Sequence, residues 1–574
     1  MQSSVTDTAA RSVIAYFSME IGLDAAMPTY SGGLGVLAGD SLRAAADLGL
    51  PMVGVSLLHR KGYFRQRLDP FGRQTELPCP WDPESLLEPM PPRVVVSIEG
   101  RPVTVRAWRY RTQGVGGREV PIFFLDTSLP ENDERDRALT DELYGGDGRY
   151  RLCQEVVLGI GGVAMLRALG FGDVRVFHMN EGHSGLLTLA LLEEQCGERG
   201  LAAATEADIE AVRQRCVFTI HTPVAAGHDR FPLSLVQEVL GPERTAFLTR
   251  SAYPDKETFN LTWFSITMSR TVNAVSFRHG QISRIMFPQQ TITAITNGVH
   301  AAGWAAPPMA ALFDRHLPSW RVDNRYLRHA IGIPTGEILA AHDEAKHALL
   351  AEVQRRTGVG LDHNAMTIGF ARRATGYKRA DLLFTDPARL RRIVSRVGPI
   401  QVIYGGKAHP KDDSGKALIE RVFAAARALA PDLKVVYLEE YDMELAKLLI
   451  AGGDLWLNTP LKPLEASGTS GMKAAINGVP SLSVLDGWWV EGHVEGITGW
   501  AIGDGPDEDS DSAKEAVSLY DKLEYVILPL FYQRPTAYAE VMRSAIALNG
   551  SFFNAQRMMS QYYLSVYRTG AWTR

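Results

Sequence analysis

Long hydrophobic runs and paired cysteines are both missing from this sequence. None of its apolar runs reaches the roughly 18 residues that a membrane-spanning helix needs. Its four cysteines form no CxxC pair, so neither a disulfide framework nor a zinc site is indicated. The first residues, MQSSVTDTAARSV, lack the basic start and apolar run of a secretory signal. We therefore expect a soluble, cytoplasmic protein with reduced thiols and no membrane partner.

A strong excess of charge of one sign is also missing. The net charge is −5, from 60 Lys and Arg against 65 Asp and Glu. Proteins that bind nucleic acids or membrane surfaces usually carry a basic face, so this balance argues against both partners. It is compatible with a neutral substrate, or with an anion bound in a local basic pocket. With 574 residues, 45% of them hydrophobic, the chain is long enough for two or more large domains.

Short apolar runs that alternate with helical patterns predict an α/β fold with mostly parallel sheets. Residues 12–18 and 52–58 read as strands, and residues 36–48 between them read as a helix. The glycine-rich turn at residues 31–35 precedes that helix, where backbone amides can meet a phosphate group.

The second half of the chain repeats this alternation, which predicts a separate doubly wound domain. The predicted strands are residues 366–371, 400–404, 433–438, 454–457 and 480–485. The predicted helices are residues 380–397, 416–428 and 443–450. We expect an N-terminal Rossmann-like domain over residues 1–304, a C-terminal one over 305–540, and a terminal helix over 541–574 that packs back on the first domain.

The most informative segment is EASGTSGMKAAING, residues 465–478. Four small or hydroxyl-bearing residues can cap a helix, with backbone amides pointing where an anion binds well: Ser467, Gly468, Thr469 and Ser470. Lys473 lies one turn inside that helix. It suits either electrostatic clamping of a phosphate or a Schiff base with a phosphorylated aldehyde cofactor. A capped helix with a surface lysine is the structural alternative.

A second segment, FARRATGYKR, follows a predicted strand and therefore lies at the carboxyl end of a sheet, where α/β folds bind ligands. It contains four cations: Arg372, Arg373, Lys378 and Arg379. Paired guanidinium groups and a lysine can clamp one or two phosphates. A solvated basic loop is the alternative.

Polar residues follow several other predicted strands. His221 and His228 lie in TIHTPVAAGHD, but no HExxH pattern or carboxylate spacing supports a metal, so we predict none. His221 then has either a structural role or a substrate contact. Asn180 and Asn297 close two more strands, and Asn297 either forms a turn or binds a sugar hydroxyl. Two Rossmann-like domains that face each other across a cleft would gather these residues into one site, as in two-domain (GT-B) glycosyltransferases.

These segments together resemble one family, the α-glucan phosphorylases of glycogen, starch and maltodextrin. The resemblance runs in the same order from about Val13 to about Ile502. EASGTSGMKAAING is similar to the family's cofactor-lysine motif, which implies that Lys473 is the Schiff-base partner of pyridoxal phosphate. FARRATGYKR is similar to the phosphate-binding segment. This implies that Arg373 and Lys378 bind the substrate phosphate and that Arg372 lies near the cofactor phosphate.

YSGGLGVLAGD, FTIHTP, TNGVHAAGW and LEEYDMELAKLLI also match family segments. The resemblance implies catalytic roles for Lys473, Arg373, Lys378 and His221. It implies cofactor contacts by Gly33, Tyr441, Gly468, Thr469 and Ser470. It implies substrate contacts by Gly32, Gly33, Leu34, Asn180, His221, Asn297, Glu465, Ser467 and Gly468.

The activity implied is phosphorolysis of terminal α-1,4-linked glucose by inorganic phosphate, which gives α-D-glucose 1-phosphate with retained configuration. The family uses the cofactor phosphate as a proton relay, its members are commonly homodimers, and we expect no allosteric regulation. A nucleotide-sugar-dependent glucan synthase-like glycosyltransferase is one rival, but it would not need the lysine motif. A non-catalytic glucan-binding protein is another, although the candidate site residues are all present together. Gly471 stands where the family has asparagine, and Asp442 where it has a basic residue.

Overall fold

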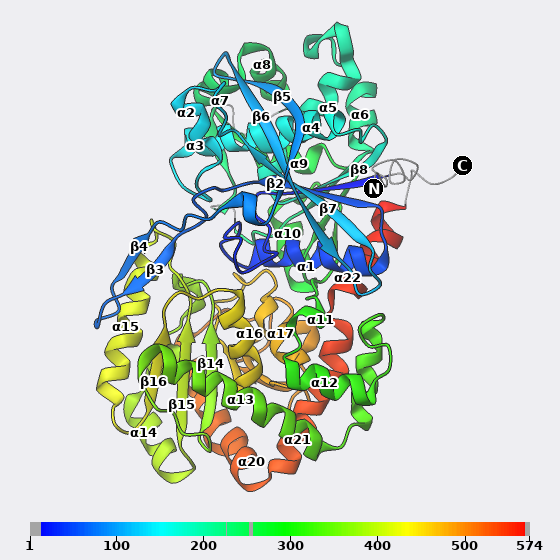
Figure 1. Ribbon diagram of the computed structural model, residues 1–574. Helices are drawn as coiled ribbons and strands as arrows, with labels where there is room; N and C mark the ends of the chain where they lie inside the picture. The colour runs from blue at the N-terminus through cyan, green and yellow to red at the C-terminus, as the bar shows by residue number, and fades with distance from the viewer. Residues whose placement is uncertain (1–12, 225–226, 252–256, 569–574) are drawn as a thin grey trace.

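The computed structural model describes residues 13–224, 227–251 and 257–568, and shows two large sheets with helices around each (Figure 1). The predicted α/β class with large, mostly parallel sheets is confirmed. Among the described residues, no helix combines the length and apolar character required to cross a bilayer.

The first sheet has nine strands in the order β13-β12-β9-β8-β1-β2-β7-β6-β5. Its parallel strands are β13 (Ile292–Ala294), β12 (Thr271–Ala274), β9 (Cys216–Thr219), β8 (Val174–Asn180), β1 (Val13–Ser18), β2 (Met52–Leu57) and β7 (Glu119–Asp126). Both faces are covered. Along β1, Ala15 and Phe17 join one apolar core, whereas Ile14 and Tyr16 join another, as the alternation of side chains in a strand requires.

Two long antiparallel strands at the edge of this sheet were not predicted from the sequence. β5 (Glu88–Ile98) pairs with β6 (Arg101–Gln113), and β6 pairs with β7. The turn between β5 and β6 is Glu99-Gly100, with φ angles of 53° and 73°. A two-residue turn with positive φ at both positions matches the twist of a hairpin. The Glu-Gly pair between valine-rich segments is therefore the sequence signal that was missed.

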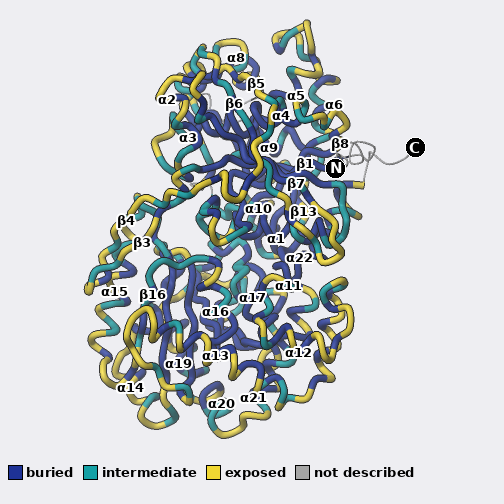
Figure 2. Tube along the Cα trace, in the orientation of Figure 1, coloured by how far each residue is buried: buried dark blue, intermediate teal, exposed yellow. Residues whose placement is uncertain are grey.

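The second sheet has six strands, all parallel, in the order β16-β15-β14-β17-β18-β19. They are β16 (Lys434–Leu438), β15 (Ile400–Gly405), β14 (Met366–Ala371), β17 (Leu455–Asn458), β18 (Ser481–Val484) and β19 (Gly499–Ile502). The five predicted strands are confirmed to within a residue at each end, and β19 was missed. Figure 2 shows buried residues, in dark blue, concentrated along the strands of both sheets.

The predicted helices of this region are largely confirmed as α15 (Asp413–Leu429) and α16 (Met443–Gly452). The predicted helix over residues 380–397 was wrong in its first part. A short 3-10 turn, Leu382–Phe384, comes first, and α14 (Pro387–Arg396) begins only at the proline. Proline favours the first turn of a helix, and the side chain of Asp386 accepts a hydrogen bond from the backbone N–H of Arg389 to cap it.

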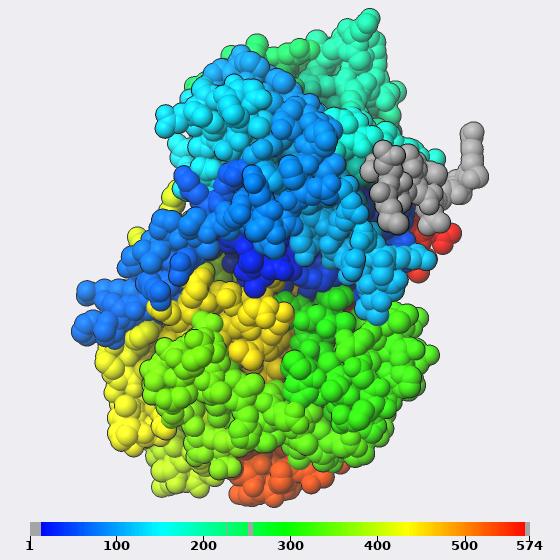
Figure 3. All heavy atoms as spheres, viewed as in Figure 1, coloured from blue at the N-terminus to red at the C-terminus, as the bar shows by residue number. Residues whose placement is uncertain are grey.

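Three segments join the two sheets. Helix α1 (Gly33–Leu48) lies between them, with Val36 in the apolar core of the second sheet (Figure 1). Helix α22 (Ala555–Tyr562), near the end of the chain, packs against α1 beside the first sheet. The hairpin of β3 (Arg65–Leu68) and β4 (Gln74–Leu77) extends from the first part of the chain to α15, where Figure 3 shows its blue atoms against the yellow atoms of that helix.

A buried charge cluster fixes helix α13 (Thr335–Thr357) to the second sheet. The carboxylate of Asp454 accepts hydrogen bonds from His342 Nε2 at 2.9 Å, Lys346 Nζ at 2.6 Å and the backbone N–H of Thr367 at 2.7 Å. Burial alone would raise the pKa of Asp454, but His342 and Lys346 outweigh it and hold the pKa below its usual value. The cluster therefore stabilises the fold at neutral pH, and that contribution is lost as the pH falls through the depressed pKa.

We predict that Asp454→Ala lowers the free energy of unfolding by about 3–5 kcal/mol, because Lys346 would be left buried without its counter-ion. Denaturant unfolding followed by tryptophan fluorescence measures the change. Asp504→Ala, at an exposed position, is the control and should change stability by less than about 0.5 kcal/mol. Equal effects of the two substitutions would contradict the prediction.

Candidate active site

Polar side chains meet at the carboxyl ends of adjacent strands in the first sheet. Ser18 ends β1 and donates its hydroxyl to the backbone carbonyl of Glu20 at 2.8 Å. Asn180 ends β8 and donates Nδ2 to Ser18 Oγ at 3.1 Å. His221 follows β9, and its Nε2 donates to Asn180 Oδ1 at 2.6 Å. Burial lowers the pKa of His221 to about 4, so its imidazole is neutral at neutral pH. Asn180 and His221, two predicted site residues, are thus in direct contact.

The predicted glycine loop is held by a buried carboxylate that the sequence analysis missed. Glu20 accepts hydrogen bonds from the backbone N–H of Ser31 at 2.6 Å and of Gly32 at 3.3 Å, and from the hydroxyl of Tyr144 at 2.9 Å. A Cβ placed on Gly32 or Gly33 would have no atom within 4 Å. The loop therefore borders open space.

The same loop begins helix α1, whose N-terminus has no side-chain cap. The first amides of a helix lack intrahelical partners and carry partial positive charge, so Gly33 and Leu34 can offer them to an anion.

In the second sheet, two predicted cations share one carboxylate. Arg372 Nη2 and Lys378 Nζ both donate to Glu465 Oε2, and all three side chains are buried. Burial alone would raise the pKa of Glu465, but the two cations hold it at about 2. Burial, with the nearby Arg372, lowers the pKa of Lys378 to about 7. Within the described ranges, Arg372 Nη1 has no hydrogen-bond partner. The cluster has more cationic groups than anionic ones, so a bound anion would offset the excess.

Arg373, the next residue, is exposed to solvent even though protein groups surround it. Burial alone would lower the pKa of Arg373, but the neighbouring Tyr377 is the first of several groups that raise it. Glu20, Tyr63 and Tyr144, from the part of the chain that forms the first sheet, lie close enough to raise its pKa. Arg373 thus extends from the second sheet toward the glycine loop of the first, and water can reach it.

Lys473 lies on helix α17 (Thr469–Ile476), with its Nζ 3.8 Å from the centre of the Trp304 ring. Trp304 is itself fixed by a hydrogen bond from Nε1 to Asp40 Oδ2 at 2.8 Å. Burial lowers the pKa of Lys473 to about 8, so more of its amine is neutral at neutral pH than for an exposed lysine, although the charged form still predominates. No group in the described part of the chain accepts a hydrogen bond from its Nζ. A buried, unpaired amine of this kind fits covalent attachment to a carbonyl compound.

The N-terminus of α17 is open. Gly468 precedes it in the left-handed region, with φ 86°, and no side chain caps the helix. Ser467 Oγ is buried and has no partner among the residues that the structure covers. Ser470 Oγ, by contrast, accepts a hydrogen bond from Trp456 Nε1 at 3.1 Å. The first amides of α17, including that of Thr469, can therefore bind an anion.

Two further predicted site residues are Tyr441 and Asn297. Burial raises the pKa of the Tyr441 hydroxyl, and the Arg372 guanidinium is close enough to oppose part of that rise. Asn297 is anchored through its backbone, with its N–H donating to Val275 O and its carbonyl accepting from Arg557, both at 3.0 Å. The charged groups that affect the pKa of Lys473 are Asp40 and Arg43 of α1, and within the described residues no hydrogen bond or ion pair joins Lys473 to the Arg372–Lys378–Glu465 cluster.

Both departures from the family pattern have a local structural explanation. A Cβ on Gly471 would lie 2.8 Å from the Trp488 ring, so the indole occupies the space that a side chain would need. Asp442 caps α16, because its carboxylate accepts a hydrogen bond from the backbone N–H of Leu445 at 2.8 Å.

Gln66, on the β3–β4 hairpin, connects to two loops of the second sheet and was also missed. Its Nε2 donates to Gly406 O at 2.9 Å, and its Oε1 accepts from the backbone N–H of Glu440 at 3.1 Å. Gly406 follows Gly405, whose carbonyl accepts a hydrogen bond from the Arg372 backbone N–H at 3.0 Å, and Glu440 precedes Tyr441. Only 1% of Gln66 is exposed. The hairpin thus fixes the backbone beside two predicted site residues.

We predict that Gln66→Ala increases hydrogen–deuterium exchange of the amides at residues 405–408 and 439–442. The substitution removes the buried side-chain amide that bonds both segments and leaves the Gly406 carbonyl without this donor. Gln113→Ala is the control, because Gln113 is exposed and bonds only Glu119. Unchanged exchange in both segments would show that Gln66 does not hold them.

Comparisons with known proteins show the family of this chain. A family model described as carbohydrate phosphorylase matches residues 242–496. A maltodextrin phosphorylase of Thermococcus litoralis is 38% identical, over 96% of this chain and 70% of its own length. A glycogen phosphorylase of Mycobacterium tuberculosis is 37% identical, over 97% of this chain and 71% of its own. A glycogen phosphorylase of Aquifex aeolicus is 36% identical, over 96% and 86% respectively. The chain belongs to the carbohydrate phosphorylase family.

Proposed function

We propose that this chain is an α-1,4-glucan phosphorylase. It releases the terminal glucose of an α-1,4-glucan with inorganic phosphate and forms α-D-glucose 1-phosphate with retained configuration. The observation that carries the proposal is the excess of cationic groups around Glu465, where Arg372 and Lys378 share one carboxylate. An enzyme that binds phosphate beside a second phosphate needs such an excess to offset their mutual repulsion.

In this proposal the two sheets are the centres of two Rossmann-like domains of the GT-B type that face a central cleft. Residues 1–304 form the first domain, residues 305–540 form the second, and residues 541–574 return to the first. The polar residues at the carboxyl ends of the parallel strands in both sheets support this arrangement. So do hydrogen bonds between the two parts: Ser276 Oγ donates to Ala466 O, and Thr296 Oγ1 donates to Glu491 Oε2, both at 2.7 Å.

Pyridoxal 5′-phosphate is the proposed cofactor, and the residues fit it. Lys473 is buried, and its amine has no hydrogen-bond acceptor among the described residues, which leaves it available as a covalent anchor. The uncapped N-terminus of α17 and the unpartnered Nη1 of Arg372 provide donors for a phosphate group. Gly33 and Tyr441 would complete the contacts. When bound, the cofactor supplies a phosphate that can exchange a proton with the substrate phosphate.

The chain's own residues then have distinct tasks. Arg373 and Lys378 bind the substrate phosphate, and the anion raises the pKa of Lys378 above about 7, so that the lysine is charged in the complex. The amides of Gly33 and Leu34 add neutral donors. Glu465, kept ionised by its two cations, accepts hydrogen bonds from sugar hydroxyls, as does Asn297. His221 stays neutral and oriented by Asn180, so it adds no charge beside the reacting sugar.

The substrate phosphate protonates the glycosidic oxygen in this mechanism. The bond between that oxygen and the anomeric carbon breaks, and the shortened glucan leaves with a free hydroxyl group. An oxygen of the same phosphate then bonds to the anomeric carbon from the face that the glucan has left, which retains the configuration. No pair of carboxylates of the glycosidase kind is required.

The test is production of glucose 1-phosphate from maltodextrin by purified protein reconstituted with pyridoxal phosphate, with and without inorganic phosphate. We expect product only when phosphate is present. ADP-glucose and UDP-glucose are supplied in a parallel reaction. Glucan elongation from either nucleotide sugar without phosphorolysis would support a synthase instead. No product under any condition would contradict the proposal.

The same assay locates the phosphate site. Arg373→Ala should lower kcat/KM for phosphate by about 10- to 150-fold, the equivalent of losing one charge-assisted hydrogen bond of about 1.5–3 kcal/mol. Glucan binding should change far less. Arg355→Ala, at an exposed position on α13, is the matched control. An unchanged dependence on phosphate would remove Arg373 from the site.

We predict that Lys473→Ala abolishes retention of the cofactor, because no other group would bind it covalently. The absorbance of the purified protein above about 300 nm, where pyridoxal derivatives absorb and polypeptide does not, is the measurement. Lys447→Ala, an exposed lysine paired with Glu444, is the control and should retain the cofactor. A Lys473→Ala protein with a full complement of covalently bound cofactor would disprove the assignment.

A further inference from the structure

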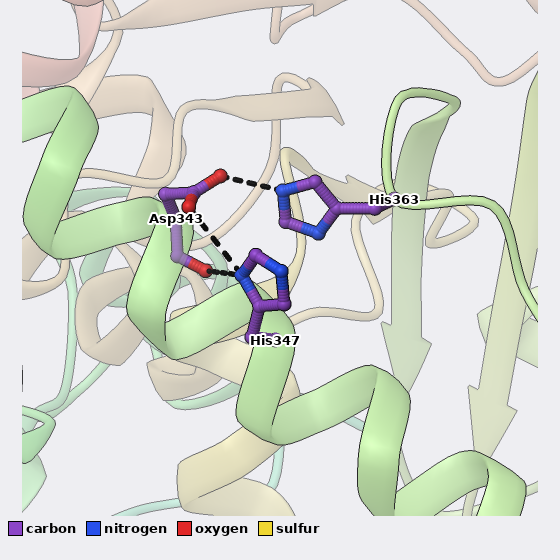
Figure 4. A group of neighbouring side chains, drawn as sticks. All are labelled: Asp343, His347 and His363. Carbon is purple, nitrogen blue, oxygen red and sulfur yellow. Dashed lines mark hydrogen bonds and ion pairs between the residues drawn. The ribbon is translucent and has the colours of Figure 1, made fainter.

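A group of three metal-ligating side chains lies at the opposite end of β14 from Arg372 and Arg373. Asp343 and His347 are one turn apart on helix α13, and His363 lies in the connection between α13 and β14 (Figure 4). This connection enters the amino end of β14, whereas the phosphate-binding segment leaves its carboxyl end. The group is therefore separate from the candidate active site.

The three side chains converge on one point, as Figure 4 shows. His363 Nε2 is 2.5 Å from Asp343 Oδ1, and His347 Nδ1 is 3.4 Å from Asp343 Oδ2. His347 Nδ1 also donates a hydrogen bond to the backbone carbonyl of Asp343, one turn earlier in the helix, at 2.9 Å. The two imidazole rings are stacked, with centroids 3.8 Å apart and an interplanar angle of 28°. One ligand atom from each residue lies within 4.8 Å of the other two. The arrangement exists before any ion is added.

These distances are close to those of a tetrahedral metal site. Ligand atoms at about 2.0–2.1 Å from Zn²⁺ lie about 3.3 Å from one another at tetrahedral angles. The carboxylate-to-imidazole distances of 2.5 and 3.4 Å lie on either side of that value. To complete the geometry, the His347 side chain must release its hydrogen bond to the Asp343 carbonyl, and all three side chains, each at least partly exposed, must adjust.

We propose that Asp343, His347 and His363 bind a divalent transition-metal cation of the Zn²⁺ class, with water in the remaining coordination position. Two imidazoles and one carboxylate form a donor set that suits Zn²⁺, Ni²⁺ or Cu²⁺, whereas Mg²⁺ and Ca²⁺ select oxygen ligands.

An ordinary ion pair accounts for the geometry less well. An ordinary ion pair joins one imidazole to one carboxylate, whereas here two stacked imidazole rings, with centroids 3.8 Å apart, lie against the same carboxylate. His363 Nδ1 is buried and, across the described residues, makes no hydrogen bond. A metal ion would account for two imidazoles that meet at one carboxylate, because it binds neutral imidazoles together with a carboxylate and leaves a net charge of about +1 on the site.

The bound ion would tie the middle of α13 to the chain that enters β14. The same helix is already attached to the second sheet through Asp454 on its buried side, so the metal would add a second attachment on the exposed side. The site is structural in this proposal. At temperatures well below unfolding, the cation should leave the rate of the reaction unchanged.

The test uses the full chain without a polyhistidine tag, in a buffer free of phosphate. Zn²⁺ is titrated by calorimetry, Co²⁺ is titrated by visible absorption, and thermal unfolding is recorded with and without Zn²⁺. We expect one equivalent of Zn²⁺, a Co²⁺ spectrum of four-coordinate type, and a higher Tm with Zn²⁺. His347→Gln, His363→Gln and Asp343→Asn should each weaken binding at least tenfold and abolish the rise in Tm.

His316→Gln is the matched control, because His316 is exposed and pairs with a single carboxylate, Glu337, at 2.9 Å. It should bind Zn²⁺ as the unchanged protein does. Failure of the unchanged protein to bind Zn²⁺, equal affinity in all three variants, or displacement by equimolar Mg²⁺ would each overturn the proposal. Loss of binding on Cys79→Ser, with the three variants unaffected, would also overturn it.

Discussion

Arg372 and Lys378 can be buried side by side only because Glu465 lies between them. Each cation loses hydration on burial and each disfavours the charge of the other, and one carboxylate offsets part of that cost. Glu465 is itself fixed, since its backbone N–H donates to Asp486 Oδ2 at 2.8 Å. Burial and the charge of Glu465 raise the pKa of Asp486 to about 7. Gly468, at the open N-terminus of α17, lies against the Glu465 side chain and so beside this incompletely neutralised charge.

The contacts between the two sheets are arranged around the same region. On one side, Ser276 and Thr296 of the first part bond Ala466 and Glu491 of the second. Elsewhere, Gln66 bonds Gly406 and Glu440. Between these ties, Arg373 faces Glu20, which holds the glycine loop. Hydrogen bonds of Ser276, Thr296 and Gln66 thus hold the two parts of the chain together, and none of these three side chains is a predicted ligand-binding group.

The sequence was sufficient for five of the six strands of the second sheet, because parallel strands buried on both faces read as short apolar runs. It also predicted which segments follow the strands, and so which cations and hydroxyls gather there. It could not reveal Glu20 or Gln66, since the partners of a buried polar group can lie hundreds of residues away, as Gly406 does from Gln66. The Asp343 group was missed for a similar reason: two ligands share a helix, but the third depends on where the next loop turns. The β5–β6 hairpin, by contrast, had a local turn signal that was overlooked.

The β3–β4 hairpin belongs to the first part of the chain by sequence, but most of its side-chain hydrogen bonds go to the second. Gln74, for example, donates to Ala408 O at 2.9 Å, and Lys416 pairs with Glu76 at 2.9 Å. Any rotation of one sheet relative to the other must therefore either break these bonds or move the hairpin together with the second sheet. If the hairpin moves with the second sheet, the chain must bend in the two short connections that flank the hairpin. The part of the chain that moves with the second sheet would then include the hairpin, although the hairpin belongs to the first part by sequence.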